Sequence, residues 1–159
     1  MSAELILNHL RKTGRKLIFA ESLTGGLLAD AFIEVPGASE VVLGSEVTYA
    51  NSLKAALLGV EEELLAEQGA VSAAVASAMA QGVYAVGLAA ADLEPDQLLA
   101  LATTGNAGPD GDPVGRVFIA LTDGSKKKVR EFEFGGNRQE IRLQSVNAAI
   151  DLLREHLAI

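Results

Sequence analysis

A predicted strand that runs into a glycine-rich turn and then a helix is the feature that most constrains the fold. The apolar run Lys16–Phe19 precedes Ala20–Gly26 (AESLTGG), and apolar residues recur at helical spacing after it. Glycines allow a sharp turn, and the first turn of a helix leaves backbone N–H groups without partners. The sequence therefore predicts a strand–turn–helix unit with a hydroxyl group, Ser22 or Thr24, at the turn.

Two interpretations of these hydroxyl groups are open. A serine at such a turn is placed to act as a nucleophile or as a ligand of an anion, because backbone N–H groups lie close by. A serine or threonine at the same place also commonly caps a helix, which stabilises it by about 1 kcal/mol. The motif alone does not decide between Ser22 as a catalytic group and Ser22 or Thr24 as a cap.

Helices and strands alternate along most of the chain, which is typical of an α/β protein. Residue patterns predict helices over residues 3–15, 25–34, 52–58, 61–68, 72–90 and 138–157. They predict strands over residues 16–20, 40–49, 97–104, 114–122 and 128–134, the last two forming a hairpin. We expect one domain over residues 1–159: a three-layer α/β/α fold with a mixed sheet of five to six strands, including the C-terminal hairpin.

Composition excludes several classes of protein. The formal net charge of −8 argues against general nucleic-acid binding, which needs a cationic surface. With no cysteine, the chain has neither disulfides nor a cysteine-based zinc site. Asp110 and Asp112 flank a glycine but lack the further acidic ligand of a calcium loop, so we expect no metal.

The N-terminus and the apolar segments argue against export and membrane insertion. Residues 1–4 lack the basic start of a signal peptide, and we find no uninterrupted apolar run approaching the about 18 residues of a membrane helix. We therefore expect a cytoplasmic protein that contacts no membrane.

Three loops with hydroxyl groups and glycines each follow a predicted strand. They are Glu21–Gly26, Tyr49–Lys54 and Thr103–Pro109. Loops at the carboxyl ends of parallel strands meet at one edge of an α/β sheet, where ligands bind. We expect the three loops to share a pocket.

A serine and a lysine are the best candidates for chemistry in that pocket. His9 and His156 lie far along the chain from the three loops, which argues against a Ser–His–Asp triad. A lysine kept neutral by burial can activate a serine instead, and Lys54 is the only lysine near the loops. The alternative is a solvated lysine on a short helix.

Two arginines at the start of the last predicted helix are candidates for binding an anion. Arg138 and Arg142 lie one helical turn apart, so both guanidinium groups can grip one phosphate. Equally, they can pair with surface glutamates.

Seven segments, taken in order, resemble the CinA C-terminal domain family and cover nearly the whole chain. They are AESLTGG (20–26), VPGAS (35–39), TYANSLKAALLGV (48–60), GAVS (69–72), TGNAGP (104–109), PVGRVFIAL (113–121) and FGGNRQEIR (134–142). The resemblance implies an α/β/α enzyme without metal or cofactor. The resemblance further implies that this enzyme hydrolyses the carboxamide of nicotinamide mononucleotide. The products would be nicotinate mononucleotide and ammonia, and the reaction would recycle pyridine nucleotides.

The same resemblance assigns roles to individual residues. It makes Ser22 the nucleophile and Lys54 its proton acceptor, with Tyr49 and Thr104 completing the catalytic set. The implied substrate-binding residues are Ser39, Thr24, Gly25, Gly26, Gly105, Asn106, Arg138 and Arg142. Among these, Ser39 lines the reacting carboxamide together with Tyr49 and Thr104, and Arg138 or Arg142 meets the phosphate. Backbone N–H groups near Gly25–Gly26 or Thr104–Gly105 stabilise the oxyanion.

Some positions depart from the pattern of the family. Leu23 stands where a cysteine is usual, Asn106 replaces an apolar residue, and the stretch between Pro109 and Pro113 is short. Ser45–Glu46 stands where glycines are common. If Glu46 points into the pocket, it pairs with Lys54 and keeps the amine protonated. The larger N-terminal domain that often precedes this one is not in the sequence, so we expect its activity to be missing.

Three functions remain open at this point. The first is the amidohydrolase, acting on a small-molecule nucleotide. The second is a binding module without catalysis that holds a pyridine nucleotide or another phosphorylated metabolite. The third is a structural partner domain that packs through its alanine-rich helix. We expect a homo-oligomer in each case.

Overall fold

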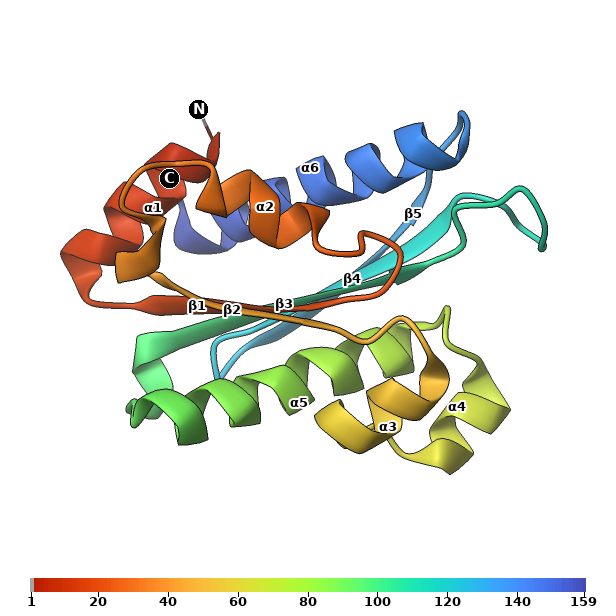
Figure 1. The fold of residues 1–159 in the computed structure, drawn as a ribbon, viewed down its shortest axis with the longest axis horizontal. Helices are drawn as coiled ribbons and strands as arrows, with labels where there is room; N and C mark the ends of the chain where they lie inside the picture. The colour runs from red at the N-terminus through yellow and green to blue at the C-terminus, as the bar shows by residue number, and fades with distance from the viewer. Residues whose placement is uncertain (1) are drawn as a thin grey trace.

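A five-stranded mixed sheet lies between two layers of helices in the computed structural model, which describes residues 2–159 (Figure 1). The strands are β1 (Lys16–Glu21), β2 (Val42–Val47), β3 (Leu98–Gly105), β4 (Arg116–Thr122) and β5 (Lys127–Glu133). The helices are α1 (Ser2–Thr13), α2 (Leu27–Ile33), α3 (Asn51–Leu58), α4 (Glu62–Gln68), α5 (Ala73–Ala91) and α6 (Arg138–Leu157). Two short 3₁₀ helices are η1 (Ala38–Glu40) and η2 (Pro95–Gln97). The predicted α/β class, the mixed sheet and the C-terminal hairpin are confirmed.

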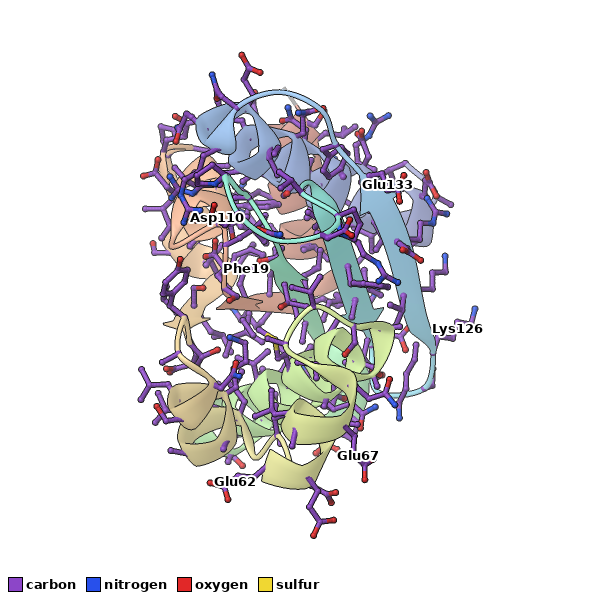
Figure 2. All side chains as sticks on the ribbon, turned by 90° about the vertical axis from the view of Figure 1, so that its right-hand side faces the viewer. Phe19, Glu62, Glu67, Asp110, Lys126 and Glu133 are labelled. Carbon is purple, nitrogen blue, oxygen red and sulfur yellow. The ribbon has the colours of Figure 1, made fainter. Side chains whose placement is uncertain are left out.

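The order of the strands brings the three loops to one end of the sheet. The order is β2-β1-β3-β4-β5, with β1 parallel to both β2 and β3, and β4 antiparallel to β3 and β5. The carboxyl ends of β1, β2 and β3 therefore lie together, on the right in Figure 1. Figure 2 looks onto this end, where the loop that carries Asp110 crosses between the two helical layers.

Two apolar cores fill the space on either side of the sheet. Helices α1, α2 and α6 cover one face, and α3, α4 and α5 cover the other (Figure 1). The central strand β3 is buried from Leu98 to Thr104. A run this apolar is expected for a strand covered on both faces.

Small residues let α5 approach its neighbours closely. A Cβ atom at Gly82 would lie 2.0 Å from the Leu58 carbonyl oxygen, and one at Gly87 would lie 2.8 Å from Leu98 Cδ2. Side chains at these positions would push α5 away from α3 and from the sheet. The glycines and alanines of the helix therefore set the distance between the layers.

Helix α5 bears on the expectation that the protein contacts no membrane. Its 19 residues, Ala73–Ala91, are long and apolar enough to cross a membrane by length and composition alone. A core helix passes the same test, and here Val75, Met79 and Val83 are fully buried in the core beneath the sheet.

Two local features of the fold depend on single residues. The register of the β1–β2 pairing shifts between Leu17 and Ile18: Leu17 pairs with Val42, and Ile18 pairs with Gly44. This shift is expected for a bulge at Gly44. The Ser72 hydroxyl accepts a hydrogen bond from Val75 N and caps α5.

A partly buried carboxylate, that of Asp123, connects the hairpin turn to the last helix at the opposite end of the sheet. Asp123 accepts hydrogen bonds from Ser125 N, Ser125 Oγ and Lys126 N, and its Oδ2 lies 2.9 Å from His156 Nε2. Burial by itself would raise the pKa of Asp123, but these hydrogen bonds and the imidazole lower it to about 2. Burial also lowers the pKa of His156, outweighing the opposite effect of Asp123, so the ring is neutral at pH 7.

We predict that Asp123→Asn, which mimics the protonated acid, destabilises the protein by about 2 kcal/mol at pH 7. The pKa of this carboxyl is lower in the folded than in the unfolded chain. Its contribution is therefore complete above pH 4 and is lost as the pH falls toward 2. Urea unfolding of wild type and variant between pH 7 and pH 2.5 measures the difference. An equal difference at both ends of this range would contradict the prediction, and Asp112→Asn is the control.

Candidate active site

Ser22 and Lys54 meet at the carboxyl ends of the parallel strands. Ser22 follows β1 and Lys54 lies on α3, and Lys54 Nζ is 3.1 Å from Ser22 Oγ. Ser22 is 7% exposed and Lys54 only 1% exposed. The alternative of a solvated lysine is therefore wrong, and the two groups predicted to react together are in hydrogen-bond contact.

The surroundings of Lys54 favour a neutral amine. Its Nζ also lies 2.8 Å from the Thr48 carbonyl oxygen and 3.0 Å from that of Tyr49. Burial lowers the pKa of Lys54 below its ordinary value. A neutral amine has two N–H groups for the two carbonyls and one lone pair for the Ser22 hydroxyl. This arrangement suits a base that takes the proton of Ser22.

No carboxylate pairs with Lys54 within residues 2–159. The three partners of its amine are uncharged, and Glu46 forms no ion pair with it. The structure therefore does not support the suggestion that Glu46 pairs with Lys54 and keeps its amine protonated.

The turn that presents Ser22 is held at both ends. Ser22 N donates to the Thr103 carbonyl oxygen, and Gly25 N donates back to that of Ser22. Gly25 and Gly26 both have positive φ angles, 55° and 104°, which other residues rarely adopt. The glycines of the motif are therefore required by the turn.

Neither Ser22 nor Thr24 caps α2, which corrects the second interpretation of the motif. The N-cap is Gly26, without a side-chain hydrogen bond, and Thr24 Oγ1 pairs with Thr103 Oγ1 at 2.8 Å. Among residues 2–159, the Ser22 hydroxyl has Lys54 as its hydrogen-bond partner.

The first turn of α2 is capped by Glu21, which was not among the candidate site residues. Its carboxylate accepts from Gly26 N, Leu28 N and Ala29 N, and also from the Ser45 hydroxyl. An acidic residue just before a helix was the available signal, since negative charge is favourable at a helix N-terminus.

The amides of Gly25 and Gly26 are thus unavailable for an oxyanion, contrary to one expectation. Gly25 N donates to Ser22 O, and Gly26 N donates to Glu21 Oε1. In the described part of the chain, Leu23 N and Thr24 N donate to no acceptor. They are the free amides of this turn.

The third loop contributes structure near the pair. Thr104 Oγ1 donates to the Ala70 carbonyl oxygen at 2.7 Å, and Asn106 Oδ1 accepts from Gly108 N. A Cβ atom at Gly105 would lie 2.7 Å from Val117 and 3.1 Å from Leu23. These residues hold the α4–α5 connection, the loop and the serine turn together.

The two arginines bind backbone carbonyls of the loops rather than surface glutamates. Arg142 Nε donates to Leu23 O at 2.8 Å, and its Nη2 donates to Thr24 O at 3.3 Å. Arg138 donates to the Gly108 carbonyl oxygen and, through Nη2, to the Tyr49 hydroxyl at 3.0 Å. Helix α6 thereby links all three loops.

Ser39 does not lie with these residues in the chain. It sits in η1, before β2, while Tyr49 and Lys54 follow the other end of that strand. Six residues of strand separate the two ends by about 20 Å. The structure therefore does not bring Ser39 together with Lys54, and its contact with the carboxamide stays a prediction.

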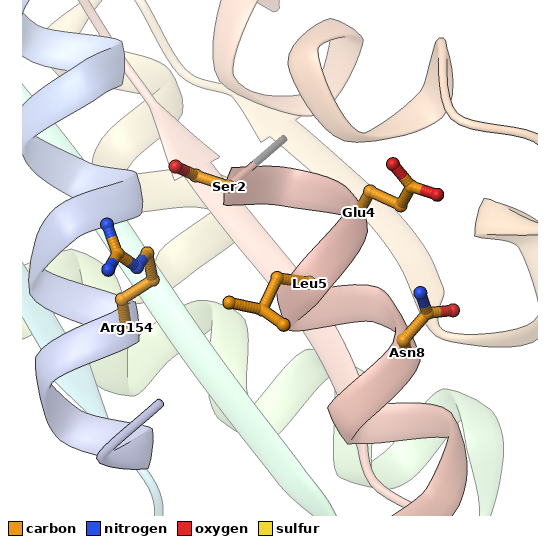
Figure 3. Close-up of a pocket in the computed structure, with 5 residues that line it drawn as sticks. All are labelled: Ser2, Glu4, Leu5, Asn8 and Arg154. Atoms are coloured by element: carbon orange, nitrogen blue, oxygen red, sulfur yellow. The ribbon is translucent and has the colours of Figure 1, made fainter.

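Two surface pockets are lined by neither Ser22 nor Lys54. One of about 450 Å³ lies between α1 and α6, lined by Ser2, Glu4, Leu5, Asn8 and Arg154 (Figure 3). Along α6, Arg154 is about 24 Å from Arg138. Another of about 360 Å³ opens between α3 and α4. The pocket expected between the three loops stays a prediction, and no cluster of metal-binding side chains occurs in residues 2–159.

Known proteins match this chain over nearly its whole length. The model of the CinA C-terminal domain matches residues 1–157. CinA-like proteins of Geobacter metallireducens and Syntrophomonas wolfei are 50% and 45% identical over 151 and 152 residues. These matches cover 92% and 93% of this chain but 35% of each relative. The chain thus spans about a third of the length of these relatives.

Solved structures of similar length share the fold. The competence damage-inducible protein A of Klebsiella pneumoniae has a TM-score of 0.87 and 31% identity, over 99% of this chain and 97% of that one. The competence/damage inducible protein CihA of Agrobacterium tumefaciens has a TM-score of 0.87 and 37% identity, over 97% and 92% of the two chains. Together with the match of the family model, these similarities show that the chain belongs to the CinA C-terminal domain family.

Proposed function

We propose that this protein is an amidohydrolase that converts nicotinamide mononucleotide to nicotinate mononucleotide and ammonia. The observation that carries the proposal is the contact between the Ser22 hydroxyl and the buried amine of Lys54, which has no charged partner within residues 2–159. Membership of the CinA family and the order of the motifs around this pair support it.

The reaction proceeds through an acyl-enzyme. Ser22 Oγ attacks the carbon of the carboxamide while Lys54 Nζ takes the hydroxyl proton. Lys54 then gives this proton to the departing nitrogen, which leaves as ammonia, and the substrate remains as an ester of Ser22. Water attacks the ester, losing a proton to Lys54, and Ser22 regains its proton as the carboxylate leaves.

The free amides of the turn are placed to stabilise the oxyanion. Leu23 N and Thr24 N directly follow the nucleophile and have no acceptor in residues 2–159. Two adjacent amides beside an attacking serine are an effective arrangement, and one donor typically contributes about 3 kcal/mol to the transition state.

The phosphate of the nucleotide is bound by Arg138. Arg142 already has partners for Nε and both terminal nitrogens, whereas Arg138 uses only its terminal nitrogens and is exposed. Its remaining N–H groups lie beside Tyr49.

The alternative of a binding module without catalysis rested on Glu46 and on the short stretch between Pro109 and Pro113. Since Glu46 does not pair with Lys54, the short loop is the feature that still favours it. Calorimetric binding of the nucleotide without release of ammonia would select the alternative.

We predict that Ser22→Ala and Lys54→Met each lower kcat for ammonia release by about 10³-fold or more, because each removes one half of the reacting pair. Methionine keeps the apolar stem of this buried lysine. An enzyme-coupled ammonia assay with nicotinamide mononucleotide measures the rates. Lys128→Met is the control, and unchanged turnover in both variants would refute the mechanism.

We predict that kcat/KM rises with pH along a curve whose midpoint lies below 10.5. The base is active only when neutral, and burial lowers the pKa of Lys54 in the folded protein. The pH–rate profile of the wild type measures this midpoint. A profile flat across the range from pH 6 to pH 10 would argue against a lysine base.

We predict that Arg138→Ala raises KM for nicotinamide mononucleotide about tenfold and leaves KM for nicotinamide riboside, which lacks the phosphate, nearly unchanged. A charge-assisted hydrogen bond to phosphate is worth about this much. Initial rates with both substrates test the assignment. An equal effect on the two would show that the arginine acts on the loops instead.

A further inference from the structure

We propose that Glu21 is a positioning residue that keeps the Ser22 hydroxyl and the Lys54 amine in hydrogen-bond contact. The inference rests on the proposed function, since it concerns the same pair of groups. It assigns a role to a residue that neither touches the substrate nor exchanges protons.

Glu21 is saturated with hydrogen bonds. It is fully buried at the end of β1. Its Oε1 accepts from Gly26 N at 3.2 Å and Leu28 N at 2.8 Å, and its Oε2 accepts from Ala29 N at 3.2 Å and Ser45 Oγ at 2.7 Å. A carboxylate has about four acceptor sites, so none remains for substrate or water. Its role is therefore not that of an acid or base.

The carboxylate closes the turn that presents the nucleophile. Ser22 directly follows Glu21 in the chain, and the turn ends at Gly26, whose N–H returns to Glu21 Oε1. The turn is thus fastened at both ends to one residue. The Ser45 contact fastens the same residue to β2, which leads into the loop before Lys54.

The backbone of Glu21 reaches the lysine as well. Its carbonyl oxygen accepts from Thr48 N at 2.9 Å, and the carbonyl oxygen of Thr48 accepts from Lys54 Nζ at 2.8 Å. With the contact of 3.1 Å between Nζ and Ser22 Oγ, these bonds form a closed circuit through both reacting groups. A change in the position of Glu21 therefore alters the distance between Ser22 Oγ and Lys54 Nζ.

Electrostatics explain why an acid is needed at this position. A buried charge is costly unless it is compensated, and no cation pairs with Glu21 among the described residues. The three amides of α2 and its positive end compensate the charge. A neutral side chain would hold these amides more weakly, and the turn would loosen.

The test uses a graded pair of variants with a matched control. Glu21→Gln removes the charge, Ser45→Ala removes one of the four hydrogen bonds, and Ser145→Ala removes a buried serine hydroxyl on α6 that bonds only to Ile141 O. We expect kcat to fall about 100-fold in Glu21→Gln and about tenfold in Ser45→Ala, with KM within threefold of wild type. Ser145→Ala keeps kcat within twofold.

A second measurement does not depend on catalysis. NMR titration of the Cε resonance of Lys54 in protein with ¹³C-labelled lysine, assigned with Lys54→Met, reports the protonation of this amine. We expect a higher Lys54 pKa in Ser45→Ala than in wild type, because a loosened turn admits water to the amine while the charge of Glu21 stays in place. An unchanged or lower value in folded Ser45→Ala overturns the inference, as does an unchanged kcat in folded Glu21→Gln.

The two measurements separate this inference from the proposed function. If wild type releases no ammonia from nicotinamide mononucleotide, the proposed function fails, and the NMR titration still decides the role of Glu21. If Glu21→Gln does not fold, as judged by its thermal unfolding, Ser45→Ala supplies the same two measurements. Loss of kcat with wild-type KM supports the inference, and an unchanged rate overturns it.

Discussion

The burial of the Lys54 amine, without a counter-ion in the described part of the chain, is the constraint on which the rest of the site depends. An ammonium group is costly to remove from water, so Lys54 at 1% exposure is favoured in its neutral form. Two backbone carbonyls take its N–H groups and orient its lone pair toward Ser22. A carboxylate in place of either carbonyl would have held the proton on the lysine. The chemistry of the pair thus follows from what surrounds it.

The sheet provides the geometry that this burial requires. Because β1 runs parallel to both β2 and β3, the serine turn, the lysine loop and the threonine loop leave the sheet at the same end. Helix α6 crosses to them and binds their carbonyl oxygens through Arg138 and Arg142. Rigid strands on one side and guanidinium groups on the other hold loops that would otherwise move independently.

Much of the architecture could be predicted because its signals are local. Periodic apolar residues, the Ser72 cap and the glycines of the turn each act within a few residues, and α6 begins and ends where its pattern indicates. Contacts between distant segments could not be read in this way. Ser39 was placed at the site although a whole strand separates it from Lys54, and Glu21 was missed although it adjoins the nucleophile.

The sequence by itself determined the α/β class, the three loops and the pairing of Ser22 with Lys54 as the candidate chemistry. Only the tertiary structure decided that the lysine is buried against uncharged partners, that Glu21 rather than a hydroxyl caps α2, and that Glu46 does not pair with Lys54. The physical reason is that burial and charge compensation depend on groups brought together from far along the chain. A local sequence pattern indicates which helix, strand or turn a segment can form. The burial and charge environment of that segment depends on how the other segments pack around it.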